Sequence, residues 1–152
     1  MLHGDPDLVF TDRRGWPKVS GLHDARLKTL SVAFGQRLAF SAVGDDGRQT
    51  DVVLDGLHML NIDGLWEDTI IDSVAIWRVA EDLDDTSGGS CNGAWDALLA
   101  GRVPDERRAA EIARLRHAYD GSQLVAVSSS YGGELQALCR QVLIDGRGVA
   151  SV

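Results

Sequence analysis

The chain has 152 residues, 23 of them acidic and 15 basic, which gives a formal net charge of −8. Nucleic acids and anionic membranes are bound through basic surfaces, so this balance argues against both as general partners. Hydrophobic residues make up 44% and charged residues 25%, the composition of a globular chain with a core of its own. We therefore expect a single domain over residues 1–152.

The first half of the chain has the pattern of short β-strands. Residues 1–21 form a lead-in arm rich in Gly, Pro and Asp, and an antiparallel meander follows over 22–80. Apolar residues in the meander alternate or run continuously between turns that contain Gly and Asp, such as Asp55-Gly56. Strands are expected at residues 26–34, 37–43, 49–54, 57–62 and 69–79.

The second half begins with a different composition. Residues 81–93 are acidic and rich in Gly and Ser, which is typical of a loop. Two helices are expected over 94–120, the second of them at 104–119. Pro104 suits the first turn of that helix, and Asp105 and Glu106 favour the positive end of its dipole.

The last segment, 134–144, matches both a helical and a strand pattern. A strand is expected at 123–129, and the turn Tyr131-Gly132-Gly133 directly after it favours a C-terminal hairpin over 123–146. The expected fold is therefore α+β. It is an antiparallel β-meander of about six or seven strands, as an open sheet or a sandwich, with a two-helix insertion before the hairpin.

The acidic residues are concentrated in the middle of the chain. Residues 45–85 contain 12 acidic and 2 basic residues, a charge of −10, which leaves +2 for the remainder. Such a segment is most often a solvated face that keeps a protein soluble. The alternative is a docking face for a basic partner, and its candidate residues are Asp55, Asp63, Glu67, Asp68 and Asp72.

One alternative is an enzyme. His23-Asp24 pairs an imidazole with a carboxylate, and Cys139 or Cys91 would then be the nucleophile of a small hydrolase or transferase. Adjacent residues on a strand point to opposite faces, which favours a packing role for His23 and a backbone hydrogen bond for Asp24. Gly89-Ser90-Cys91-Asn92-Gly93 fits a nucleophile-elbow pattern, but no strand leads directly into it.

No cofactor or metal is expected. His3, His58 and His117 lack zinc-ligand spacing, the acidic stretch from Asp82 lacks the closing Glu of a calcium loop, and no glycine-rich phosphate loop occurs. Two cysteines are too few for a disulfide framework. The N-terminus lacks a secretory signal, and no apolar run has the length of a membrane span. We expect a cytoplasmic protein with free thiols.

Three segments together resemble a known group of proteins. Trp16-Pro17 precedes Leu22-His23-Asp24-Ala25, the acidic segment carries Asp55-Gly56 and Asp63-Gly64, and Ser130-Tyr131-Gly132-Gly133 precedes the last expected strand. The set resembles small, largely uncharacterised bacterial β-rich proteins with a W-P…H-D-A entrance and an S-Y-G turn. Some of these are thought to be immunity proteins, which neutralise a toxin in the same cell. The resemblance implies a β-rich fold with a strand at 134–144, and no catalytic residues.

The leading hypothesis is a non-enzymatic protein-binding module of immunity type, steered to a basic partner by its acidic segment. A structural homodimer formed through exposed sheet edges is a third alternative. Besides the acidic residues, the candidate binding residues are Trp16, His23, Asp24, Ser130, Tyr131, Gly132 and Gly133.

Overall fold

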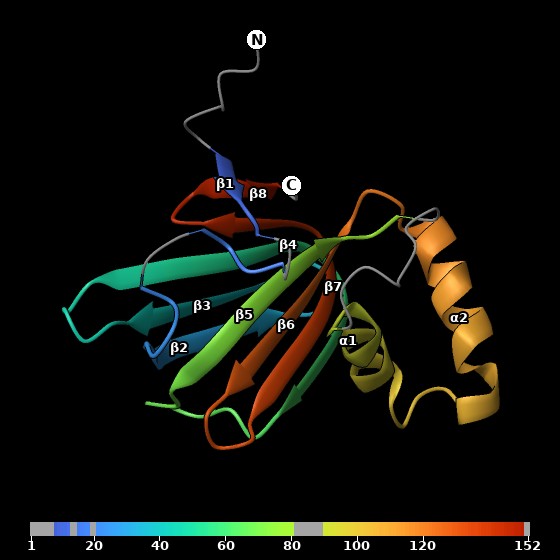
Figure 1. Ribbon diagram of the computed structural model, residues 1–152, viewed down its shortest axis with the longest axis horizontal. Coiled ribbons are helices and arrows are strands. Elements are labelled where there is room, and N and C mark those ends of the chain that lie inside the picture. The colour runs from blue at the N-terminus through green and yellow to red at the C-terminus, as the bar shows by residue number, and fades with distance from the viewer. Residues whose placement is uncertain (1–7, 13–14, 19–20, 81–89, 151–152) are drawn as a thin grey trace, which may run out of the picture.

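The computed structural model describes residues 8–12, 15–18, 21–80 and 90–150. They form an α+β fold with an open, mostly antiparallel sheet and a C-terminal hairpin, which confirms the expected class (Figure 1). The helices are α1 (Ser90–Leu99) and α2 (Asp105–Ala118). The strands are β1 (Leu8–Phe10), β2 (Arg26–Ala33), β3 (Arg37–Val43), β4 (Gln49–Asp63), β5 (Ile71–Arg78), β6 (Gln123–Ser129), β7 (Glu134–Ile144) and β8 (Arg147–Ala150).

Strand β4 differs from the sequence pattern. The two strands expected at 49–54 and 57–62 are one strand of fifteen residues. Gly56 has a φ of 66°, and the register against β7 shifts between Leu57 and Met59, so the strand bends there instead of turning back. The turn expected at Asp55-Gly56 is therefore wrong. Pairing with β7 on both sides of the glycine holds the chain extended, with a β-bulge at the bend.

The ends of two expected segments also differ. Residues 8–10, expected within the lead-in arm, form β1, and residues 147–150 form β8, which the sequence pattern does not predict; the two pair in parallel. Helix α1 begins at Ser90, so residues 90–93 belong to its first turn and not to the acidic loop expected at 81–93. Residues 81–89 of that loop and residues 1–7 of the arm, which include His3, lie outside the described residues.

Strand β7 has three strands as neighbours. One edge pairs with β4 along almost its whole length, from Asp63↔Glu134 to Val52↔Ile144. The other edge is divided: β6 pairs with residues 134–139, and β8 pairs with Leu143 and Ile144. The sheet continues from β4 to β3 and β2, from β6 to β5, and from β8 to β1. Two branches of the sheet thus leave one edge of β7.

The buried side chain of Gln123 bridges the point where these branches separate. Its Oε1 accepts a hydrogen bond from Val142 N at 2.6 Å, and its Nε2 donates to Val149 O at 2.8 Å. The backbone of Gln123 is already paired with Cys139 at the start of β6. One glutamine side chain therefore supplies the hydrogen bonds that an interrupted ladder would leave unmade.

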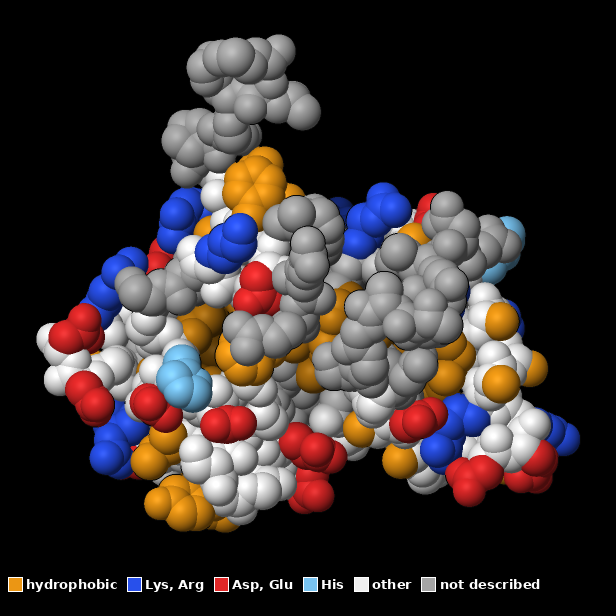
Figure 2. Space-filling model, viewed as in Figure 1, with side chains coloured by type: hydrophobic (Ala, Val, Ile, Leu, Met, Phe, Trp, Pro, Cys, Tyr) orange, Lys and Arg blue, Asp and Glu red, His pale blue; other side chains and the backbone are white. Residues whose placement is uncertain are grey.

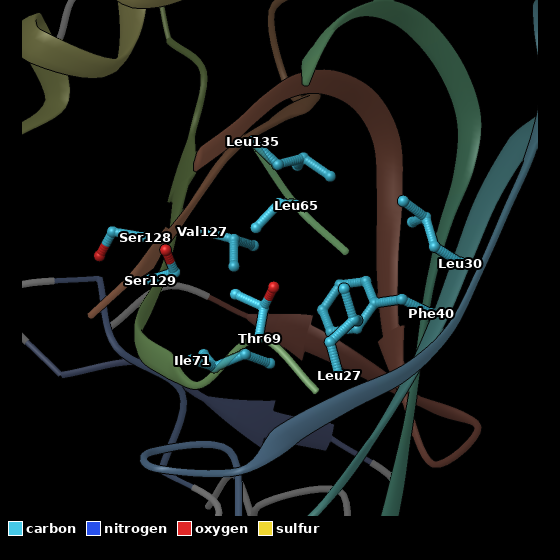
Figure 3. Close-up of a pocket in the computed structure, with 10 residues that line it drawn as sticks. All are labelled: Leu27, Leu30, Phe40, Leu65, Thr69, Ile71, Val127, Ser128, Ser129 and Leu135. Carbon is cyan, nitrogen blue, oxygen red and sulfur yellow. The ribbon is translucent and has the colours of Figure 1, made fainter. Parts of the chain in front are cut away.

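The sheet curls so that β5 and β6 cross over β2 and β3 (Figure 1). Four backbone hydrogen bonds of 2.7–2.9 Å between residues 24–27 and 68–71 link the start of β2 to the chain entering β5. The main core lies inside the curl. A cavity of about 10 Å³ remains there, between Leu27 and Phe40 on one side and Val127 and Leu135 on the other (Figure 3). That is room for about one water molecule, so the interior is closely packed.

The helices cover one end of the outer face of the sheet. Trp95, Leu98 and Leu99 of α1 and Leu115 of α2 are buried with Leu124 and Leu138 in a second apolar cluster. Outside that contact α2 is mostly solvent-exposed. The end of α2 is also held to β4 by stacking of Tyr119 on His58, with ring centroids 4.4 Å apart.

The bridging role of Gln123 predicts a large loss of stability in a Gln123→Leu variant. Leucine fills a similar volume but leaves Val142 N and Val149 O buried without partners. We expect the free energy of unfolding, measured in urea, to fall by about 2–4 kcal/mol, because each unpaired buried polar group costs roughly 1–3 kcal/mol. Gln141→Leu, at an exposed position of β7, is the matched control. A loss no greater than that of the control would contradict this role.

The environment of His58 predicts a pH dependence of stability. Burial lowers the pKa of His58 below its ordinary value of 6.5, and the positive charge of Arg140 lowers it further. The unfolded chain therefore binds the proton first, so the free energy of unfolding falls as the pH drops through 6.5 and levels off below the folded-state pKa. His58→Phe keeps a stacking ring that cannot titrate. We expect it to show a smaller loss between about pH 7.5 and 5.5 in urea unfolding. Equal losses in both proteins would refute this assignment.

Candidate functional site

The residues of the W-P…H-D-A entrance lie along the free edge of β5. Ile76 N donates to Gly15 O at 2.7 Å, and Asp24 N donates to Ile71 O at 2.8 Å. His23 Nδ1 lies 2.5 Å from Asp72 O and must be the donor, because a carbonyl oxygen only accepts. These contacts pair an edge that would otherwise be open, as backbone groups of an edge strand require. The entrance segment therefore has a structural function.

The structure does not bring His23 together with either sulfur. The imidazole is largely exposed, with its Nε2 3.5 Å from Asp24 Oδ2. Cys139 is fully buried in the core, where burial raises the pKa of its thiol to about 12, so it holds almost no thiolate at neutral pH. Cys91 packs against the second apolar cluster, under the helices, at the opposite end of β5 from Asp72. The candidate catalytic residues are thus distributed over three environments.

The S-Y-G turn and the acidic segment meet at one end of the sheet. Ser130 N donates to Ile70 O at 3.1 Å. A Cβ added to Gly133 would lie 2.8 Å from the carbonyl carbon of Gly64, so the two glycines touch with no room for a side chain. We call the residues of these two turns that face solvent the acidic tip. They are Asp63, Trp66, Glu67, Tyr131 and the neighbouring Asp72.

Two of the five predicted docking carboxylates are paired with cations from distant strands. Asp55, in the middle of β4, forms an ion pair with Arg140 of β7. Asp68 forms one with Lys28 of β2. The hydrogen bond from Lys28 also lowers the pKa of Asp68. Within the described part of the chain, the carboxylates of Asp63, Glu67 and Asp72 contact no cation or hydrogen-bond donor. Of the five predicted docking carboxylates, the three without a cation are therefore all at the tip.

The tip also carries large exposed aromatic side chains. Trp66 is 63% exposed and Tyr131 is 76% exposed. Figure 2 shows hydrophobic and acidic side chains together at the lower end of that view, where the two turns lie in Figure 1. Sequence reasoning singled out Tyr131 but missed Trp66. The available signal was an aromatic residue in the turn that follows Asp63-Gly64.

A second feature is a groove of about 360 Å³ on the outer face of β5, β6 and β7, between Trp16 and α1. Its floor follows from the strand register, which aligns side chains in rows across the three strands. The rows, from the helices toward the tip, are Trp77–Leu124–Leu138, Ala75–Ala126–Gln136 and Ser73–Ser128–Glu134. Because α1 packs on the first row and the alanines of the second are short, the space above the second row stays open.

The described residues contain no cluster of three or more His, Cys, Asp or Glu side chains that could hold a metal ion. None of the helices in the described ranges is long and apolar enough to cross a membrane. The chain matches no protein-family model, no curated protein and no solved structure. The functional interpretation therefore depends on the geometry of the tip and the groove.

The contact between Gly64 and Gly133 predicts that alanine is unfavourable at Gly133, in contrast to alanine at the uncrowded Gly93. Gly133→Ala would press a methyl group against the Gly64 backbone and force the two turns apart, at a cost of about 1–3 kcal/mol. Gly93→Ala in helix α1 meets nothing within 4 Å and should stabilise the protein by up to about 1 kcal/mol, from helix propensity. Urea unfolding measures both. A Gly133→Ala variant as stable as the wild type would mean that the turns are not held in contact.

Proposed function

We propose that this protein is a non-enzymatic module that binds a basic protein partner through the acidic tip. The observation that carries the proposal is the pairing of two exposed aromatic side chains, Trp66 and Tyr131, with carboxylates that have no cation partner in the described part of the chain. Large solvent-exposed aromatic residues cost free energy in water unless a partner covers them. Unpaired carboxylates next to them favour a partner of positive charge.

The two kinds of side chain would contribute differently to binding. Trp and Tyr bury large apolar areas and are the residues most often found at the energetic centre of protein interfaces. Carboxylates at the rim act over a longer range and mainly accelerate association, an effect that salt screens. Trp66 and Tyr131 would therefore hold the partner, while Asp63 and Glu67 would steer it.

The proposed partner type follows from the same chemistry. The formal charge of −8 is complementary to a basic protein. The resemblance to proteins that are thought to be immunity proteins supports a toxin of the same cell as the first partner to test. In that case binding would neutralise the toxin without any reaction catalysed by this chain.

Removing the two aromatic side chains should weaken partner binding. The immobilised wild-type chain captures basic proteins from a lysate of cells that express it, at about 50 mM and 500 mM salt, and each captured protein is then purified for equilibrium binding. We expect Trp66→Ala with Tyr131→Ala to raise the Kd at least about tenfold. Phe34→Ala is the control, because Phe34 is 81% exposed but lies at the turn between β2 and β3.

The steering carboxylates give a second, kinetic result. Asp63→Asn with Glu67→Gln should lower the association rate constant and leave the dissociation rate nearly unchanged. A partner that binds the aromatic double variant as tightly as the wild type would contradict the proposal. Capture of a second copy of this chain would favour the homodimer instead, since β2 beyond Leu27 has a free edge in the described sheet.

A further inference from the structure

The groove beside α1 is separate from the aromatic side chains of the tip. Most of its lining is apolar, and the end nearest the tip is polar. Its middle row contributes Ala75 and Ala126, whose short side chains make an apolar floor. Trp16 and Trp77 line it together with the first turns of α1. The volume of about 360 Å³ lies within the range of small-molecule sites, roughly 300–1,000 Å³. The groove therefore has the size and apolar lining for a small organic ligand.

The polar row closes the end of the groove nearest the tip. Ser73 and Ser128 are register partners on β5 and β6, and their hydroxyl oxygens are 2.6 Å apart. Figure 3 shows the Ser128 hydroxyl directed away from the interior cavity, which places it on the groove side of the sheet. In such a pair one hydroxyl donates to the other, and both oxygens keep a lone pair that can accept a hydrogen bond from a ligand. This end of the groove can therefore bind a polar group.

Glu134 sets the charge that this end accepts. It lies on β7 as the register partner of Ser128 and is half-buried, and its carboxylate forms no hydrogen bond or ion pair within the described part of the chain. It is also the single charged side chain among the described residues that line the groove. A half-buried carboxylate without a partner favours a cation and disfavours an anion. Trp side chains nearby favour a cation for the same electrostatic reason.

We propose that this groove is a binding site for a small organic cation with an apolar body. The ammonium or guanidinium group pairs with Glu134 and the Ser73–Ser128 hydroxyls, and the apolar body covers Ala75 and Ala126 between the tryptophans. The site does not use the aromatic side chains of the tip, although Asp63 of the tip is the register partner of Glu134. It adds a ligand-binding function to the outer face of β5, β6 and β7.

The test uses phenethylammonium as the probe, with 2-phenylethanol and 3-phenylpropionate as its neutral and anionic counterparts. Isothermal titration calorimetry on the full chain should give a Kd on the order of 1 mM or tighter for the cation, as for a ligand of about ten heavy atoms. The neutral probe should bind at least about fivefold more weakly, and the anion should not bind measurably. Equal affinity for all three probes would overturn the proposed role of Glu134.

Variants then locate the probe. Glu134→Gln should weaken cation binding about tenfold, whereas Glu67→Gln, the same chemical change at the tip, should leave it within about twofold. Ala126→Leu fills the groove from its floor and Ala97→Leu from helix α1, so each should abolish binding. If one leucine variant fails to fold, the other still decides the result. Undiminished binding in a folded leucine variant, or no binding by the wild type, would overturn the proposal.

The outcome is distinguishable from that of the proposed protein binding. Trp66→Ala with Tyr131→Ala removes the aromatic side chains of the tip, and neither residue lines the groove. Cation binding should therefore persist in that variant. Its loss there, with binding retained in Glu134→Gln, would place the cation at the tip and refute the groove site.

Discussion

The fold depends on how the edge of β7 is divided between two partners. At Cys139 the pairing with β6 ends, and at Leu143 the pairing with β8 begins. Between them Val142 is fully buried, and Gln123 satisfies its backbone N–H with the oxygen of its side-chain amide. Because Gln123 bridges this gap, the branch of β5 and β6 can separate from the branch of β8 and cross over β2 and β3 (Figure 1). The curl of the sheet, and the core inside it, follow from this separation.

Strands β5, β6 and β7 pack against the core with one face and carry the candidate functional surfaces on the other. Side chains of one parity, such as Val74, Val125 and Ala137, pack inside the curl. Those of the other parity form the rows that change from apolar under the helices to polar near the tip. Strand register therefore determines both where α1 packs and where the groove remains. The Gly64–Gly133 contact then brings the two turns of the tip together at the polar end.

Charge along the chain is a poor guide to charge on the surface of this protein. The −10 segment contains Asp55 and Asp68, but their partners, Arg140 and Lys28, come from strands 85 and 40 residues away in sequence. Of the five predicted docking carboxylates, the three that have no cation partner among the described residues lie around the turn after β4 and at the start of β5. The docking face predicted from the sequence thus narrows to three carboxylates, and their position near Trp66 and Tyr131 gives them a functional interpretation.

Local pattern alone determined much of the secondary structure. Alternating apolar residues specify β3, a continuous apolar run specifies β6, and Pro104 with two following acids specifies the start of α2. These signals act over a few neighbouring residues. Tertiary structure decided the features that local pattern leaves ambiguous. A glycine with positive φ fits either a turn or a bent strand, and pairing with β7 on both sides made Gly56 a bend. Burial of Cys139, pairing of Asp55, the approach of Trp66 to the S-Y-G turn and the open space above Ala126 all depend on which strands become neighbours. That choice is made by long-range hydrogen bonding and core packing, which no short window of the sequence contains.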